Sequence, residues 1–121
     1  MIFRPAEQLA RLPGPPNALW PQGARSVSAL RHGSMELKLY APRGHDPQQP
    51  HTQDELYVVQ TGHGRFDNGG EIVDFGVGDV LFVPAGRPHR FVDFSDDLAV
   101  WVVFYGPDGG EARTSSPEAH A

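Results

Sequence analysis

Short apolar segments interrupted by glycine and proline restrict the fold of this chain more than any other feature of its sequence. The 121 residues include 14 glycines and 12 prolines, and these punctuate the apolar segments from residue 25 to residue 105. Both residue types end regular structure and favour turns. The pattern therefore predicts many short strands in a sandwich or barrel, rather than a bundle of helices.

The expected strands follow a single short helix. We predict a helix over residues 5–12 and strands over residues 25–31, 35–41, 55–61, 65–67, 71–75, 79–83, 89–94 and 99–105. The strongest turn signal is Asn68-Gly69-Gly70, because asparagine and glycine accept positive φ at little steric cost. This turn predicts a hairpin between residues 64–67 and residues 71–75.

The length of the chain allows one modest hydrophobic core, since 39% of its 121 residues are hydrophobic. We therefore expect one domain, with an N-terminal arm over residues 1–24, a barrel over residues 25–105 and a flexible C-terminal tail over residues 106–121. The tail is expected because residues 107–121 are rich in glycine, serine, proline and charge.

Charge and cysteine content exclude several classes of partner and site. The net charge of −5 and the absence of any run of lysine or arginine argue against a nucleic-acid surface. No apolar run is long enough for a signal peptide or a membrane helix, so we expect no membrane partner. Without cysteine there is no disulfide and no thiolate ligand. We expect a cytoplasmic protein that binds a small molecule.

Glu55 is the residue whose predicted environment most needs explanation. It opens an apolar run, and the two-residue period of a strand places Glu55, Tyr57 and Val59 on one face. An unpaired buried carboxylate is costly, so Glu55 must coordinate a cation, meet a basic side chain or lie at a wet barrel mouth. His51 precedes it by four residues, and His89 starts a later strand.

Two motifs carry these residues, and together they resemble the paired signatures of the cupin superfamily. The first runs from Gln49 to Glu55 with Gly62 beyond it, and the second runs from Gly78 through Pro84-Ala85-Gly86 to His89. The resemblance implies an all-β fold, an antiparallel double-stranded β-helix or jelly-roll barrel. It also implies a divalent metal near one mouth of the barrel, with His51, Glu55 and His89 as ligands.

The first motif departs from the signature at Gln49, which stands where cupins usually have their first histidine. The amide oxygen of Gln49 could bind the metal or could hydrogen-bond a metal-bound water. Alternatively, Gln49 could be an ordinary loop residue, with His45 or solvent in the fourth ligand position. Asp46 is adjacent to His45 and could set the tautomer of that imidazole. Iron, manganese, nickel, copper and zinc all suit two imidazoles and a carboxylate, so the ligands alone do not name the metal.

Strand parity also predicts a ligand pocket. Tyr57 shares a face with Glu55, and Phe91 shares a face with His89. Both aromatic residues could instead belong to the core, and for Phe91 this interpretation is the favoured one. Tyr40 and Lys38 lie on the polar face of residues 35–41, which contacts either bulk solvent or a cavity. We expect Tyr57, Tyr40 and Phe91 to wall the pocket, and Tyr57 or Lys38 to supply polar contacts during catalysis.

The resemblance implies three functional alternatives. The first is a metal-dependent enzyme, a dioxygenase or an isomerase. The second is a non-catalytic binding or sensor protein, and the third is a metal-free cupin whose motif residues form a hydrogen-bond network. The strand over residues 99–105 is apolar on both faces, which suits a second covering layer. Together with the resemblance, this favours a homodimer.

Overall fold

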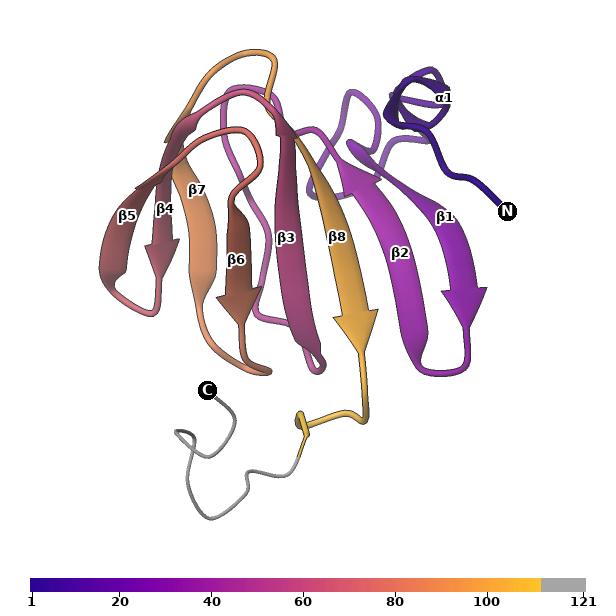
Figure 1. The fold of residues 1–121 in the computed structure, drawn as a ribbon. Helices are drawn as coiled ribbons and strands as arrows, with labels where there is room; N and C mark the ends of the chain where they lie inside the picture. Colours follow the sequence, from indigo (N-terminus) through magenta and orange to yellow (C-terminus); the bar gives the residue numbers. More distant parts are fainter. Residues whose placement is uncertain (112–121) are drawn as a thin grey trace.

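The strands form two antiparallel sheets, as the punctuation of the sequence predicts (Figure 1). A computed structural model describes residues 1–111 of the chain. Its elements are α1 (Pro5–Leu9), β1 (Ser26–His32), β2 (Met35–Tyr40), β3 (Asp54–Thr61), β4 (Gly64–Asn68), β5 (Glu71–Phe75), β6 (Val80–Val83), β7 (His89–Phe94) and β8 (Ala99–Tyr105). The expected all-β class is confirmed. The helix is shorter than expected, because the residue before Pro13 is sterically biased away from helical conformation.

Strands far apart in sequence lie next to one another in both sheets. The larger sheet has the order β1-β2-β8-β3-β6, and the smaller has the order β5-β4-β7. One apolar core contains buried side chains from both, so the sheets face each other as in a jelly-roll barrel. In this arrangement β3 and β7 belong to opposite sheets, and their inward side chains meet across the interior.

Aromatic side chains fill the closed part of that interior. Phe66 on β4 is completely buried, and its ring centroid lies 4.8 Å from that of Phe91 and 5.6 Å from that of Tyr57. Edge-to-face and tilted pairs of this kind contribute about 0.5–1.5 kcal/mol each beyond burial of their area. The cluster forms a rigid floor beneath the polar residues described below.

The predicted hairpin is confirmed between β4 and β5. Asn68 pairs with Glu71, and the two glycines between them have φ of 64° and 99°. The side chain of Asp67 accepts a hydrogen bond of 2.8 Å from the Gly70 N–H and so fixes the turn. Both loop positions require left-handed backbone, which explains why the sequence has glycine at each.

Both ends of the described chain contact the sheets. Near the N-terminus, α1 contacts β2, and Gly14 donates a hydrogen bond of 2.8 Å to the Ala24 carbonyl. After β8, the N–H groups of Gly106 and Glu111 donate to the side chains of Ser34 and Asp54. The rest of the expected tail, residues 112–121, lies outside the described residues. No helix within residues 1–111 has the length and hydrophobicity needed to cross a membrane.

Candidate metal centre

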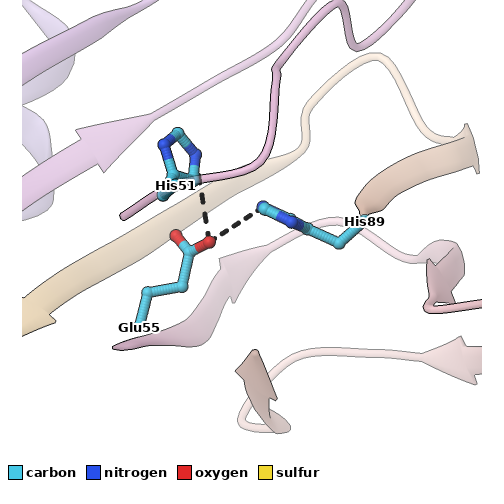
Figure 2. Close-up of side chains that lie close together, drawn as sticks. All are labelled: His51, Glu55 and His89. Carbon is cyan, nitrogen blue, oxygen red and sulfur yellow. Dashed lines mark ion pairs between the residues drawn. The ribbon is translucent and has the colours of Figure 1, made fainter. Parts of the chain in front are cut away.

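Three side chains from two sheets converge at one end of the barrel interior (Figure 2). Glu55 lies on β3, His89 begins β7, and His51 comes from the loop that leads into β3. Gly86 donates a hydrogen bond of 2.7 Å to the His51 carbonyl, which joins the turn of the second motif to the loop of the first. The left-handed φ of 77° at Gly86 permits this approach.

The distances between the polar atoms of these residues are short. His89 Nε2 lies 2.8 Å from Glu55 Oε1, and His51 Nε2 lies 3.9 Å from the same oxygen. Glu55 and the His89 side chain are almost completely buried, and His51 is about one-third exposed. One ligand atom from each residue lies within 4.8 Å of the others, so the cluster can hold a metal ion.

The tautomer of His89 makes its contact with Glu55 unusual. Nδ1 lies 2.9 Å from the Arg87 carbonyl oxygen, which only accepts hydrogen bonds, so Nδ1 carries a proton. In a neutral imidazole, Nε2 then presents its lone pair to the Glu55 carboxylate. While that imidazole is neutral, neither carboxylate oxygen receives a hydrogen bond from any residue from 1 to 111. Two facing acceptors repel each other unless a proton or a metal cation lies between them.

The pKa values of the two histidines differ because their surroundings differ. Burial lowers the pKa of His89, but its hydrogen bond and charge interaction with Glu55, together with the Arg87 carbonyl, outweigh burial and raise it overall. Burial lowers the pKa of His51, and the nearby His89 and Lys38 lower it further, against the opposing effect of Glu55. The site without a cation therefore favours one imidazolium, at His89.

Gln48 contributes a further oxygen, which the sequence did not lead us to expect. Its Oε1 lies 3.2 Å from His51 Nε2 and 3.2 Å from His89 Nε2. The Tyr57 hydroxyl donates to the same oxygen over 2.9 Å. Gln49, the predicted fourth residue, is exposed and lines the adjacent cavity, but it has no hydrogen bond within the described part of the chain.

Asp46 is also placed differently from the expectation that it sets the tautomer of His45. The exposed His45 ring packs against Trp20 with centroids 4.9 Å apart, whereas Asp46 is buried. The Asp46 carboxylate accepts hydrogen bonds from the Tyr40 hydroxyl and from the Phe91 N–H. It also accepts a bond of 2.6 Å from the side-chain amide of Gln48. Asp46 therefore links two strands to the loop at the site.

A cavity of about 260 Å³ opens beside the cluster. His51, Glu55, Tyr57, Tyr40 and Lys38 all line it, so the polar face of β2 faces a cavity rather than bulk solvent alone. The remaining lining residues come from the N-terminal arm, β1, the loop before β3, and β8. They are Asn17, Leu19, Trp20, Ser26, Gln48, Gln49, Val102 and Phe104.

Phe91 does not line this cavity, although we predicted it as a pocket wall. Its ring is 1% exposed and packs against Tyr57 and Phe75 at centroid distances of 5.1 and 5.3 Å. The two-residue strand period correctly predicted that Phe91 points into the barrel. Its burial agrees with the interpretation of Phe91 as a core residue. Its position two residues beyond His89 places it in the apolar floor, below the polar cluster.

The donor set fits a divalent transition metal. Two ligands that lie at right angles and about 2.1 Å from one metal are separated by about 3.0 Å, and opposite ligands by about 4.2 Å. Four of the separations between these atoms, Glu55–His89, Glu55–His51, Gln48–His51 and Gln48–His89, run from 2.8 to 3.9 Å and lie near this range. The hydrogen bond from His89 Nδ1 to a backbone carbonyl is also the usual orientation of a metal-binding imidazole.

Comparison with known proteins agrees with the fold. The family model for the cupin domain matches residues 37–105, which include His51, Glu55 and His89. An uncharacterized protein of Streptomyces coelicolor is 42% identical over 81 residues, which cover 65% of this chain and 77% of that protein.

Two further similarities are more distant. Acireductone dioxygenase of Geobacillus thermodenitrificans is 38% identical over 70 residues, but these cover 52% of this chain and only 39% of the dioxygenase. Among solved structures, a Cupin 2 conserved barrel domain protein from Salinispora arenicola superposes with a TM-score of 0.57. It is 20% identical, and the match covers 67% of this chain and 74% of that protein. This structural likeness supports the fold.

Proposed function

Because the chain belongs to the cupin domain family, we propose that it binds one divalent transition metal through His51, Glu55 and His89 and acts on a small organic molecule in the adjacent cavity. The observation that carries this proposal is that ligand atoms of His51, Glu55 and His89, one from each residue, lie within 4.8 Å of one another. Iron, manganese, nickel, copper and zinc all suit these ligands. A metal held there would supply Lewis acidity or oxygen activation, which are the chemistries of an isomerase or a dioxygenase.

The residues around the cavity have distinct roles in this proposal. Burial, followed by the charges of Glu55 and Asp46, raises the pKa of Tyr57 well above its usual value, so its hydroxyl stays protonated and continues to donate to Gln48 Oε1 beside the cavity. Lys38 adds a positive charge to the cavity wall. The partial match to acireductone dioxygenase supports a dioxygenase-type reaction, although this chain spans less than half of that enzyme.

Elemental analysis tests the metal. Protein purified without added metal, and again after loading with each candidate ion, should contain close to one equivalent of one of them. His89→Ala and Glu55→Gln should lose it, whereas His63→Ala, which changes an exposed histidine away from the cluster, should retain it. Absence of metal after every loading condition would refute the metal site. Oxygen uptake with enediols, phenols and 2-oxo acids then tests the dioxygenase reaction.

A non-catalytic ligand-binding or sensor function is the second candidate. It is favoured by the contact of 2.8 Å between Glu55 and His89, because the raised pKa of His89 allows the two residues to form an ion pair without a metal. A metal-free form of this alternative would rely on an imidazolium at His89 paired with Glu55. Ligand binding without turnover, across a panel of small molecules, would support the binding function over the enzyme.

We also propose a cytoplasmic homodimer. The outer face of the larger sheet carries an apolar row in which Leu37 pairs with Val103, Val103 with Leu56, and Leu56 with the exposed Phe82. A second copy of the chain would cover this row. Light scattering should give the mass of a dimer, and Phe82→Lys should shift it towards the monomer. A monomeric mass for the unmodified protein would contradict the proposal.

A further inference from the structure

We propose that Gln48, and not Gln49, supplies the amide oxygen that completes the metal site. The inference rests on the proposed function. Gln48 Oε1 lies 3.2 Å from the Nε2 atoms of both His51 and His89. Each of these two distances, from an Nε2 atom to the Gln48 oxygen, is that expected between neighbouring ligands of a single metal ion. Gln49 is exposed and has no such contact.

The buried carboxylate of Asp46 determines which end of the Gln48 amide faces the cluster. Asp46 Oδ2 accepts from Gln48 Nε2 over 2.6 Å, and a carboxylate in this position offers only acceptors. The amide nitrogen is therefore committed to Asp46, and the oxygen points to the imidazoles. Asp46 is itself fixed by the Phe91 N–H over 2.9 Å and by the Tyr40 hydroxyl.

The orientation matters because the two ends of an amide have opposite chemistry. A carbonyl oxygen can donate a lone pair to a cation, whereas the NH₂ group cannot. Asp46 thus acts as a positioning residue, in the way that second-layer carboxylates orient metal-binding imidazoles. Tyr57 donates a hydrogen bond of 2.9 Å to Gln48 Oε1, which holds the oxygen at the same place.

The two adjacent glutamines provide a matched test. Binding of Co²⁺ is measured by calorimetric titration and by the visible absorption of the bound ion, in the unmodified protein, in Gln48→Leu and in Gln49→Leu. Gln48→Leu should weaken Co²⁺ binding by about tenfold or more and change the visible bands. Gln49→Leu should alter neither. Gln48→Asn, which withdraws the amide by one methylene, should resemble Gln48→Leu and guards against a folding defect, with circular dichroism as the check.

The outcomes separate this inference from the proposed function. Equal Co²⁺ affinity and spectra in Gln48→Leu and the unmodified protein would overturn the role of Gln48 while leaving the metal site intact. An equal or larger loss in Gln49→Leu would assign the oxygen to the neighbouring residue. Failure of the unmodified protein to bind Co²⁺ would overturn both this inference and the proposed function.

A separate observation, the position of Lys38, defines the chemical class of the ligand, and this too rests on the proposed function. We infer that the cavity binds a small organic anion with a planar apolar body. Lys38 is half-buried and lines the cavity, and it has no ion pair or hydrogen bond with any residue from 1 to 111. Its charge reaches His51, whose pKa it lowers. A carboxylate in the cavity would pair with this ammonium group.

One part of the cavity wall fits an apolar body, since Trp20, Phe104 and Val102 line it together with Tyr40. Another part is polar, with Asn17, Ser26 and Gln49 among its residues, and suits the polar groups of a ligand. A divalent ion with two neutral imidazoles and one carboxylate has a net charge of +1, and Lys38 increases it. The cavity would therefore favour an anion over a neutral molecule of the same shape.

Benzoate and its neutral analogue benzamide test the charge preference. The chain has two tryptophans, so Trp101→Phe leaves Trp20 at the cavity as the fluorescent reporter. In Co²⁺-loaded Trp101→Phe, benzoate should bind at least about tenfold more tightly than benzamide. When Lys38→Met is introduced into this variant, the preference for benzoate over benzamide should disappear. When Lys38→Arg is introduced instead, most of the preference should remain. Equal binding of the two probes, or an unchanged preference in Lys38→Met, would overturn this inference without affecting the metal site.

Discussion

Replacement of Asp46 tests whether one buried carboxylate holds the site together. Asp46 is 4% exposed, and its side chain accepts from the Tyr40 hydroxyl, the Gln48 amide and the Phe91 N–H. In Asp46→Ala these three donors lose their partner inside the protein. Each unsatisfied buried donor costs about 1–3 kcal/mol, so the loss of three should lower the free energy of unfolding by roughly 3–9 kcal/mol.

Asparagine at the same position should be much less harmful. Its oxygen can keep the contacts with the Gln48 side chain and the Phe91 N–H, and its NH₂ group can donate to the Tyr40 oxygen. The Tyr40 O–H then turns towards the cavity that it lines, and only the long contact of 3.4 Å from the Gln48 backbone N–H is lost. The loss is then the difference between charged and neutral hydrogen bonds, about 1–2 kcal/mol in total. Asp96→Ala, at an exposed position, should change stability by less than about 0.5 kcal/mol.

Urea unfolding of the metal-free protein measures these differences, and thermal unfolding checks them. At about 4–8 °C per kcal/mol for a domain of this size, Asp46→Ala should lower the Tm by at least about 12 °C. A loss below about 1 kcal/mol in Asp46→Ala would refute the reasoning. Equal losses in Asp46→Ala and Asp46→Asn would show that the charge, and not the number of satisfied donors, determines stability.

Three further predictions follow from the same structure. Adding saturating metal should raise the Tm, with a stabilisation of about 2.7 kcal/mol at one hundred times the Kd, and a chelator should reverse the rise; no shift in Tm with any candidate metal would contradict the site. In metal-free protein, the raised pKa of His89 means that its contribution to stability is fully present below about pH 6.5 and is lost as the pH rises through the raised pKa. The stability difference between the unmodified protein and His89→Gln, measured by urea unfolding, should shrink over that window, and a difference that grows would be inconsistent with it. Gly64→Ala should cost more than about 3 kcal/mol, since a Cβ there would collide with the Asp93 carbonyl and with Phe94; Gly76→Ala, where the Cβ meets open space, is the control and should remain within about 1 kcal/mol.

Local patterns were sufficient to predict the strands, whereas the cluster of His51, Glu55 and His89 was expected from the resemblance of the two motifs to the cupin signatures. Strand parity alone places Glu55 and Tyr57 on one face, and both are buried in the structure. The hairpin at Asn68 follows from the conformational freedom of the glycines after it. These predictions succeed because backbone sterics and the two-residue period of a strand act over a few neighbouring residues.

The fourth oxygen could not be assigned in the same way. Gln48 and Gln49 are adjacent, identical in type and located in an irregular loop, where no period determines which side chain points inward. The choice depends on Asp46, whose own position depends on Tyr40 at the end of β2 and Phe91 on β7. The sequence by itself therefore determined the strands and the all-β class, and its resemblance to the cupin signatures implied the jelly-roll barrel and the convergence of His51, Glu55 and His89. Only the tertiary structure decided that Gln48 faces the cluster, because the hydrogen bonds that orient it join residues up to 45 positions apart.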